Sequence, residues 1–73
     1  MQIERLVYMA NQVGKFFHAQ GDAATIAGVE DHLKRFWTPA MRTQIVAHLE
    51  QGGVGLDPGV REAVKRLASK QPA

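Results

Sequence analysis

The sequence lacks cysteine, and this absence removes several classes of site at once. Without thiols the chain forms no disulfide, holds no zinc ion or iron–sulfur cluster through thiolates, and has no cysteine nucleophile. Long apolar runs are also missing, since no stretch approaches the ~20 residues of a membrane-spanning helix. The first residues do not have the basic and then apolar order of a secretory signal. We therefore expect a soluble, cytoplasmic protein that does not enter a membrane.

An excess of one charge is nearly absent as well. Nine Lys and Arg oppose seven Asp and Glu among 73 residues, for a formal net charge of +2. A nucleic-acid-binding domain usually carries a clear basic stripe, and this slight excess does not favour one. The mild basicity is compatible with docking on an acidic protein surface, although surplus Lys and Arg more often simply keep a protein in solution.

The length predicts one small domain over residues 1–73, with a short polar tail from about Ser69. Area scaling indicates that folding such a chain buries only roughly 60% of the surface that the unfolded chain exposes. Chains with so small a core usually add a disulfide, a metal ion or a partner protein. Because thiols are absent, a partner protein is the stabilising element that we expect here.

The apolar residues recur at helical spacing, and no segment alternates as a half-buried strand does. Pro disfavours the α conformation in the preceding residue and fits the first helical position, so Thr38-Pro39 and Asp57-Pro58 each predict a capped helix start. Asp22 is the expected N-cap of another helix. The four predicted helices run from about Ile3 to Ala19, from about Asp22 to Trp37, from Pro39 to the Gly52-Gly53 pair, and from Pro58 to about Leu67.

These helices predict a small all-α domain of four short amphipathic helices. Each helix has one apolar face, which we expect to point inward. The expected inner residues are Ile3, Leu6, Val7, Ala10, Val13 and Phe17; Ile26, Val29, Leu33, Phe36 and Trp37; Met41, Ile45 and Leu49; and Val60, Ala63, Val64 and Leu67.

We find no catalytic, cofactor-binding or metal-binding site in the sequence. His18, His32 and His48 are 14 and 16 residues apart, and these spacings match no compact metal-binding motif. The adjacent Glu30-Asp31 pair projects in directions about 100° apart on a helix, which is typical of a solvated face and not of a paired acid site. An enzyme with its own active site is therefore not expected.

The large apolar side chains give the strongest indication of function. Met9 and Phe16 are seven residues apart on the first predicted helix and widen its apolar surface sideways. Trp37 and Met41 stand on either side of the predicted corner between the second and third helices, and Arg42 follows at its rim. An ordinary place in the core is the alternative, above all for Trp37. Because so small a domain has difficulty covering all of these side chains, we expect an exposed, partner-binding patch formed by Met9, Phe16, Trp37, Met41 and Arg42.

Two other functions stay open on the residues alone. Basic residues load the last predicted helix, as a small regulatory nucleic-acid-binding protein would require. They project on both flanks of the apolar face, whereas a recognition helix presents its base-reading residues on one outward side. A homodimer that buries the same apolar patch against itself is the other possibility.

Three blocks of residues follow one another in order over most of the chain, from about Leu6 to Leu67. They are Met9-Ala10-Asn11-Gln12-Val13 with Phe16-Phe17; His32-Leu33 with Phe36-Trp37, Pro39 and Met41-Arg42; and Ala47-His48-Leu49 with Gly52-Gly53, Gly55-Leu56, Pro58, Val60-Arg61, Ala63-Val64 and Leu67. Taken together, these blocks resemble the delta subunit of soluble, cytoplasmic, NAD-dependent formate dehydrogenases.

The resemblance implies a non-catalytic accessory subunit. Enzymes of this kind oxidise formate to carbon dioxide and pass the electrons to NAD. Their large alpha subunit holds a molybdenum or tungsten pterin cofactor and iron–sulfur clusters, and the beta and gamma subunits hold flavin and further clusters. The delta subunit is expected to bind the alpha subunit and to support its assembly or stability, without a redox cofactor of its own.

Overall fold

The computed structural model describes the backbone of residues 2–70 and the side chains of residues 2–69. Four α-helices follow one another without a strand in this part of the chain: α1 (Ile3–Phe17), α2 (Asp22–Phe36), α3 (Pro39–Glu50) and α4 (Pro58–Lys70). A short 3-10 helix, His18–Gln20, continues from the end of α1. The all-α prediction is therefore confirmed.

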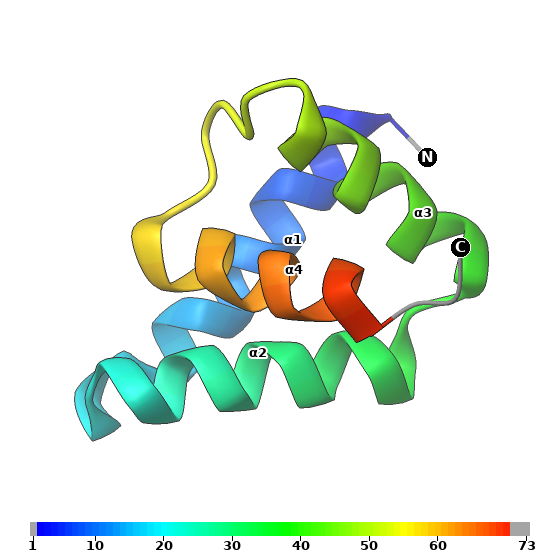
Figure 1. The fold of residues 1–73 in the computed structure, drawn as a ribbon. Helices are drawn as coiled ribbons and strands as arrows, with labels where there is room; N and C mark the ends of the chain where they lie inside the picture. The colour runs from blue at the N-terminus through cyan, green and yellow to red at the C-terminus, as the bar shows by residue number, and fades with distance from the viewer. Residues whose placement is uncertain (1, 71–73) are drawn as a thin grey trace.

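The helices pack as a small array in which α1 and α4 each contact the other three. In Figure 1, α2 runs along the lower side of the molecule, α4 lies above it and α3 lies at the top. The principal dimensions are 31 × 24 × 21 Å. Because every helix borders solvent on at least one side, each keeps a polar face as well as a buried one.

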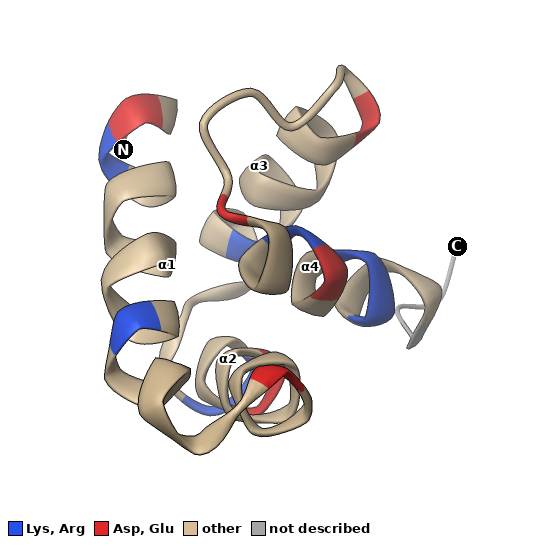
Figure 2. Cartoon of the chain, turned by 90° about the vertical axis from the view of Figure 1, so that its left-hand side faces the viewer, with Lys and Arg blue, Asp and Glu red and all other residues tan. Residues whose placement is uncertain are grey.

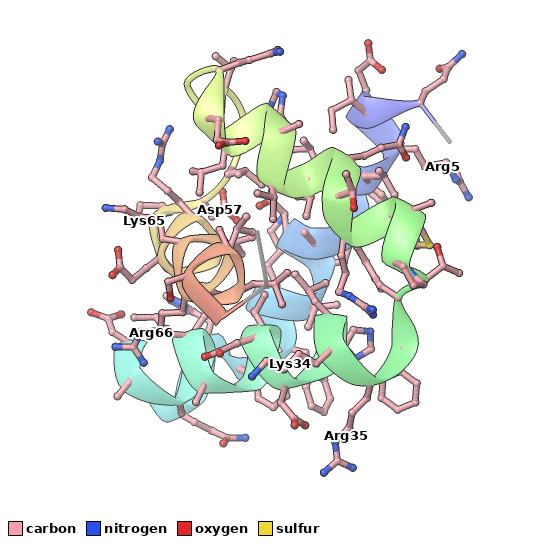
Figure 3. All side chains as sticks on the ribbon, turned by 45° about the vertical axis from the view of Figure 1, so that its right-hand side comes forward. Arg5, Lys34, Arg35, Asp57, Lys65 and Arg66 are labelled. Atoms are coloured by element: carbon pink, nitrogen blue, oxygen red, sulfur yellow. The ribbon has the colours of Figure 1, made fainter. Side chains whose placement is uncertain are left out.

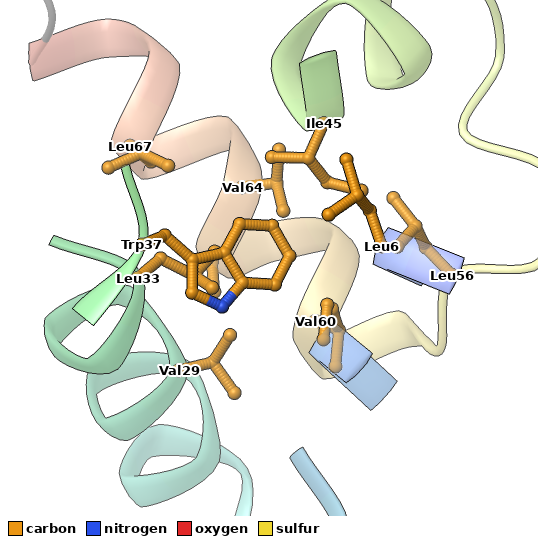
Figure 4. Packing of buried hydrophobic residues seen from close by; sticks show 11 residues of the cluster. Leu6, Val29, Leu33, Trp37, Ile45, Leu56, Val60, Val64 and Leu67 are labelled. Carbon is orange, nitrogen blue, oxygen red and sulfur yellow. The ribbon is translucent and has the colours of Figure 1, made fainter. Parts of the chain in front are cut away.

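The core lies where the four helices meet. Trp37, at the end of α2, is only 5% exposed, and its indole points into the cluster between Leu33 and Val64 (Figure 4). All four expected inner residues of α4 are buried. The buried apolar cluster consists of Leu6, Ala10, Val29, Leu33, Trp37, Ile45, Leu56, Val60, Ala63, Val64 and Leu67.

The predicted start and end of α3 are confirmed. The Thr38 hydroxyl accepts a hydrogen bond from the Met41 backbone N–H at 3.2 Å, and Pro39 occupies the first helical turn. At the other end, the Gly53 N–H donates to the His48 carbonyl at 2.9 Å and the Gly52 N–H donates to the Leu49 carbonyl at 3.0 Å. Both glycines have positive φ, so this pair of bonds is a Schellman ending.

Two other predicted helix ends are corrected. Gly21, with φ of +99°, is the N-cap of α2, and Asp22 is the first helical residue and makes no side-chain cap bond. Asp22 is still in the first turn, where its charge favours the positive end of the helix dipole. The last helix continues through Lys70, so the polar tail does not begin at Ser69; residues 71–73 of that predicted tail lie outside the described residues.

Two expectations about α2 are also wrong. Phe36 was expected inside but is 70% exposed, because the chain leaves the helix at Trp37 and turns that neighbouring ring inward. Glu30 was expected in solvent but is buried, with its carboxylate 3.2 Å from the ammonium group of Lys34. α2 packs on both α1 and α4, so its buried stripe is wide enough to include Glu30.

The connector between α3 and α4 is held by side chains of three helices. The Asn11 amide donates to the Gly55 carbonyl at 2.8 Å, and its oxygen accepts from the Asp57 N–H at 3.0 Å. Arg61 donates to the Gly52 carbonyl at 2.7 Å, and a ring nitrogen of His48 lies 2.8 Å from the Val54 carbonyl. The connector is therefore a fixed part of the fold, although it contains no regular structure.

Gly14 allows α4 to approach α1 closely. A Cβ at this position would lie 2.6 Å from a methyl group of Val60 and 3.8 Å from one of Val29. A contact of 2.6 Å is far inside van der Waals distance, so any larger residue would push α4 away from α1.

We expect Gly14→Ala to destabilise the fold by about 1–3 kcal/mol, because the added methyl group overpacks a buried helix contact. Helix propensity alone predicts the opposite sign, since Ala exceeds Gly by about 1 kcal/mol. Chemical denaturation measures the change. Gly28→Ala is a second test of the same kind, because its Cβ would lie 2.6 to 2.7 Å from three atoms of the Phe17 ring, including Cγ. Equal stability of wild type and Gly14→Ala would contradict the packing described.

We also expect Asn11→Asp to destabilise the fold by about 1–3 kcal/mol, because a carboxylate would replace the amide donor and face the Gly55 carbonyl. Gln12→Glu is a matched control, since it makes the same chemical change at the next, exposed residue. Thermal unfolding followed by circular dichroism compares the two variants. A similar midpoint for both would show that the Asn11 bonds contribute little.

Candidate docking surface

An open cavity of about 400 Å³ lies where the end of α1 meets the starts of α2 and α4. Its titratable side chains are Lys15, His18, Asp22 and Asp57. All four residues are exposed, so water screens their charges from one another and from any bound molecule. This arrangement provides no enclosed environment of the kind that binds and activates a substrate.

The histidines lie apart in the structure. His18 is in the 3-10 helix, His48 contacts the Val54 carbonyl, and the His32 ring lies 4.8 Å from the ring of Phe36. No group of three His, Asp or Glu residues that could hold a metal ion occurs within the described part of the chain. None of the helices described there has the length and apolarity needed to cross a bilayer.

The outward side of α1 has an unusual composition. At 100° per residue, its members project within about 120° of one another, and they combine apolar and basic side chains. Phe16 is 75% exposed and Tyr8 is 61% exposed, while Met9 is half-buried and also packs against the core. We call this surface the outer face of α1: Arg5, Tyr8, Met9, Gln12, Lys15 and Phe16.

The exposed ring of Phe16 is fixed in direction by its neighbour. It stacks edge-on against Phe17, with ring centroids 5.0 Å apart. Phe17 is itself half-buried against α2, close to Gly28. An apolar ring that is held outward in this way loses little side-chain entropy when a partner covers it.

Trp37 and Met41 have a different environment from Met9 and Phe16. Trp37 belongs to the core, so little of its surface is available to a partner. Met41 is half-buried and packs against the same core. Of the two environments considered for Trp37, an exposed patch and the hydrophobic core, the structure has the core.

Arg42 stabilises the end of α2. Its guanidinium lies 3.4 Å from the carbonyl oxygens of both Leu33 and Lys34 and also donates to the carbonyl of Trp37. The last carbonyls of a helix have no partner within the helix. Arg42 supplies one from the start of α3, so its positive charge is already engaged with the negative end of α2.

The five predicted docking residues therefore form two groups. Met9 and Phe16 share the outer face of α1, while Trp37, Met41 and Arg42 build the corner between α2 and α3 from within. The exposed large residues that the prediction missed are Tyr8 on α1, Phe36 on α2 and Val54 in the connector, the last 77% exposed. At 100° per residue Tyr8 projects almost opposite the expected inner residues of α1, so the helical spacing could have found this exposed ring.

Comparison with protein families identifies a matching family. A family model described as "NADH-dependant formate dehydrogenase delta subunit FdsD" matches residues 5–64. The comparisons with curated proteins and with solved structures found no match. The matched range includes the whole outer face of α1, the α2–α3 corner and the fixed connector.

We expect Arg42→Met to destabilise the fold by about 1–2 kcal/mol, because partly buried carbonyls at the end of α2 would lose a charged donor. Arg35→Met is the matched control. Arg35 forms an exposed pair with Asp31 at 3.0 Å, and such pairs contribute about 0.5 kcal/mol or less. Urea denaturation measures the free energy of unfolding of both variants. A larger loss for Arg35→Met would show that Arg42 does not cap α2.

Proposed function

The chain belongs to the family of NADH-dependent formate dehydrogenase delta subunits, and we propose that it is a non-catalytic accessory subunit of that enzyme. It binds the large alpha subunit, which in the resemblance described above carries the molybdenum or tungsten cofactor, and it supports the assembly or stability of that subunit. We place this complex in the cytoplasm. The family match over residues 5–64 is the observation that carries the proposal.

The outer face of α1 supports the docking part of the proposal. The rings of Tyr8 and Phe16 there are largely uncovered by the rest of residues 2–69, and the half-buried Met9 adds to the same apolar surface. Exposed aromatic and methionine side chains are enriched in the centres of protein interfaces. Since the core already uses Trp37 and Met41, we propose that docking centres on Met9 and Phe16, with Trp37, Met41 and Arg42 holding the adjoining corner in shape.

The accessory part of the proposal is supported by the chemistry of the chain itself. Without cysteine it could not pass electrons through a thiolate-bound cluster. The charged groups of the pocket between α1, α2 and α4 are spread around an open, exposed rim. The subunit is therefore proposed to act through binding alone.

Binding can stabilise a partner without chemistry. A subunit that binds the folded alpha subunit, and not its unfolded or open form, stabilises it by mass action. At a free concentration about 100 times the dissociation constant this contributes about 2.7 kcal/mol. That energy suffices to keep a marginal domain closed around a cofactor during or after insertion.

The test is a comparison of two exposed phenylalanines. We expect Phe16→Ser to weaken binding to formate dehydrogenase by about tenfold or more, because a central apolar contact of an interface costs about 2 kcal/mol on truncation. Phe36→Ser removes a ring of nearly equal exposure, 70% against 75%, from another helix and should leave binding within about twofold. The tagged chain is added to formate dehydrogenase purified from cells that lack this subunit, and binding is measured by surface plasmon resonance.

Wild-type chain that does not bind the enzyme would refute the accessory role. If Phe36→Ser weakens binding and Phe16→Ser does not, the accessory role stands, but the docking surface lies at the end of α2. Circular dichroism of both variants confirms that each is folded, which their exposure leads us to expect.

A further inference from the structure

The basic residues of the chain differ in whether the fold already uses their charge. Lys34, Arg35 and Lys65 form ion pairs with acidic residues on their own helices. Arg42 and Arg61 donate to backbone carbonyls. The remaining basic side chains within residues 2–69, which have no acidic or carbonyl partner there, are Arg5, Lys15 and Arg66.

Two of these three unpaired cations lie on the outer face of α1. Arg5 and Lys15 are ten residues apart, so about 15 Å of helix separates them along the axis. Tyr8, Met9 and Phe16 lie between or beside them. α1 forms one edge of the molecule, with a basic segment near each end (Figure 2), and the Arg5 side chain extends away from the rest of the chain (Figure 3). Glu4, the acidic residue of α1, projects about 100° away from Arg5 and just beyond the edge of the outer face, about 20° from the direction of Lys15.

This charge pattern distinguishes between possible occupants of the face. If a second copy docked by two-fold symmetry with antiparallel α1 helices, each Arg5 would approach Lys15 of the other copy. With parallel helices, Arg5 would meet Arg5 and Lys15 would meet Lys15. Both arrangements bring like charges together at the ends of an apolar contact, which costs free energy and slows association. An acidic partner surface reverses the sign of both interactions.

We infer that the outer face of α1 docks into an apolar groove of the alpha subunit whose rims are negatively charged near Arg5 and near Lys15. This inference rests on the proposed function, and it adds the chemistry of the partner surface and the direction of α1 along it. Tyr8, Met9 and Phe16 enter the groove as an amphipathic helix face does. The two cations meet the acidic rims, where they fix the register of the helix and speed encounter.

The experiment compares two charge-reversal variants of the full chain. Arg5→Glu/Lys15→Glu reverses the outer face of α1. Lys65→Glu/Arg66→Glu is the matched control, because it makes the same change in net charge at exposed positions of α4 (Figure 3). Binding to formate dehydrogenase that lacks the subunit is measured at several salt concentrations between about 50 and about 500 mM, a range that shortens the Debye length severalfold.

We expect the wild-type association rate to fall severalfold over this range of salt. At the lowest salt, Arg5→Glu/Lys15→Glu should bind about tenfold more weakly than wild type, with most of the loss in the association rate, while Lys65→Glu/Arg66→Glu should stay within about twofold. Sedimentation of the isolated wild-type chain should give a monomer at both ends of the range.

Other results would overturn the inference in distinct ways. If both variants bind the enzyme as tightly as wild type does, the acidic groove is refuted and the accessory role stands. Absence of wild-type binding at every salt concentration would refute the accessory role and this inference with it. A wild-type dimer that Phe16→Ser dissociates would identify a second copy as the occupant. Tight binding of a labelled single-stranded oligonucleotide, lost in Arg5→Glu/Lys15→Glu alone, would identify nucleic acid instead.

Discussion

The contact between Gly14 and Val60 is the constraint on which the rest of the structure depends. α1 and α4 each pack on the other three helices, so the distance between these two sets the width of the whole core. The absent side chain at Gly14 lets Val60 occupy the space of a Cβ. Within residues 2–69 the buried cluster consists of eleven apolar residues, and Tyr8 and Phe16 on the outer face of α1 remain exposed.

The sequence predicts most of the helix ends because they depend on local backbone chemistry. Pro39 and Pro58 begin their helices, and Gly52 and Gly53 end α3, since each residue fits a backbone conformation that others adopt only at a cost. Asp22 was misplaced by one residue because Gly21 and an aspartate are both acceptable N-caps, and only the path of the chain after the 3-10 helix decides between them. Local rules give the type of boundary more securely than its exact residue.

The candidate site was harder to predict because exposure is a tertiary property. Periodicity placed Met9 and Phe16 at the border of the inner face, where the structure has them, but it treated Phe36 and Trp37 alike. Their burial differs greatly because α2 ends between them. The role of Arg42 depends on three carbonyls that precede it by five to nine residues, and nothing in the spacing of charges reveals that α3 turns back over the end of α2. The family match identifies the enzyme to which such subunits belong, which geometry alone does not name.

The position of Trp37 gives the chain a built-in optical probe. It is the only tryptophan among the 73 residues, and its indole lies inside the core. Its fluorescence in the isolated chain therefore reports on the interior, with a blue-shifted emission that moves to longer wavelength when water reaches the ring. Tyr8 lies on the face proposed for docking, so the two chromophores separate the state of the core from the state of the surface in one small molecule.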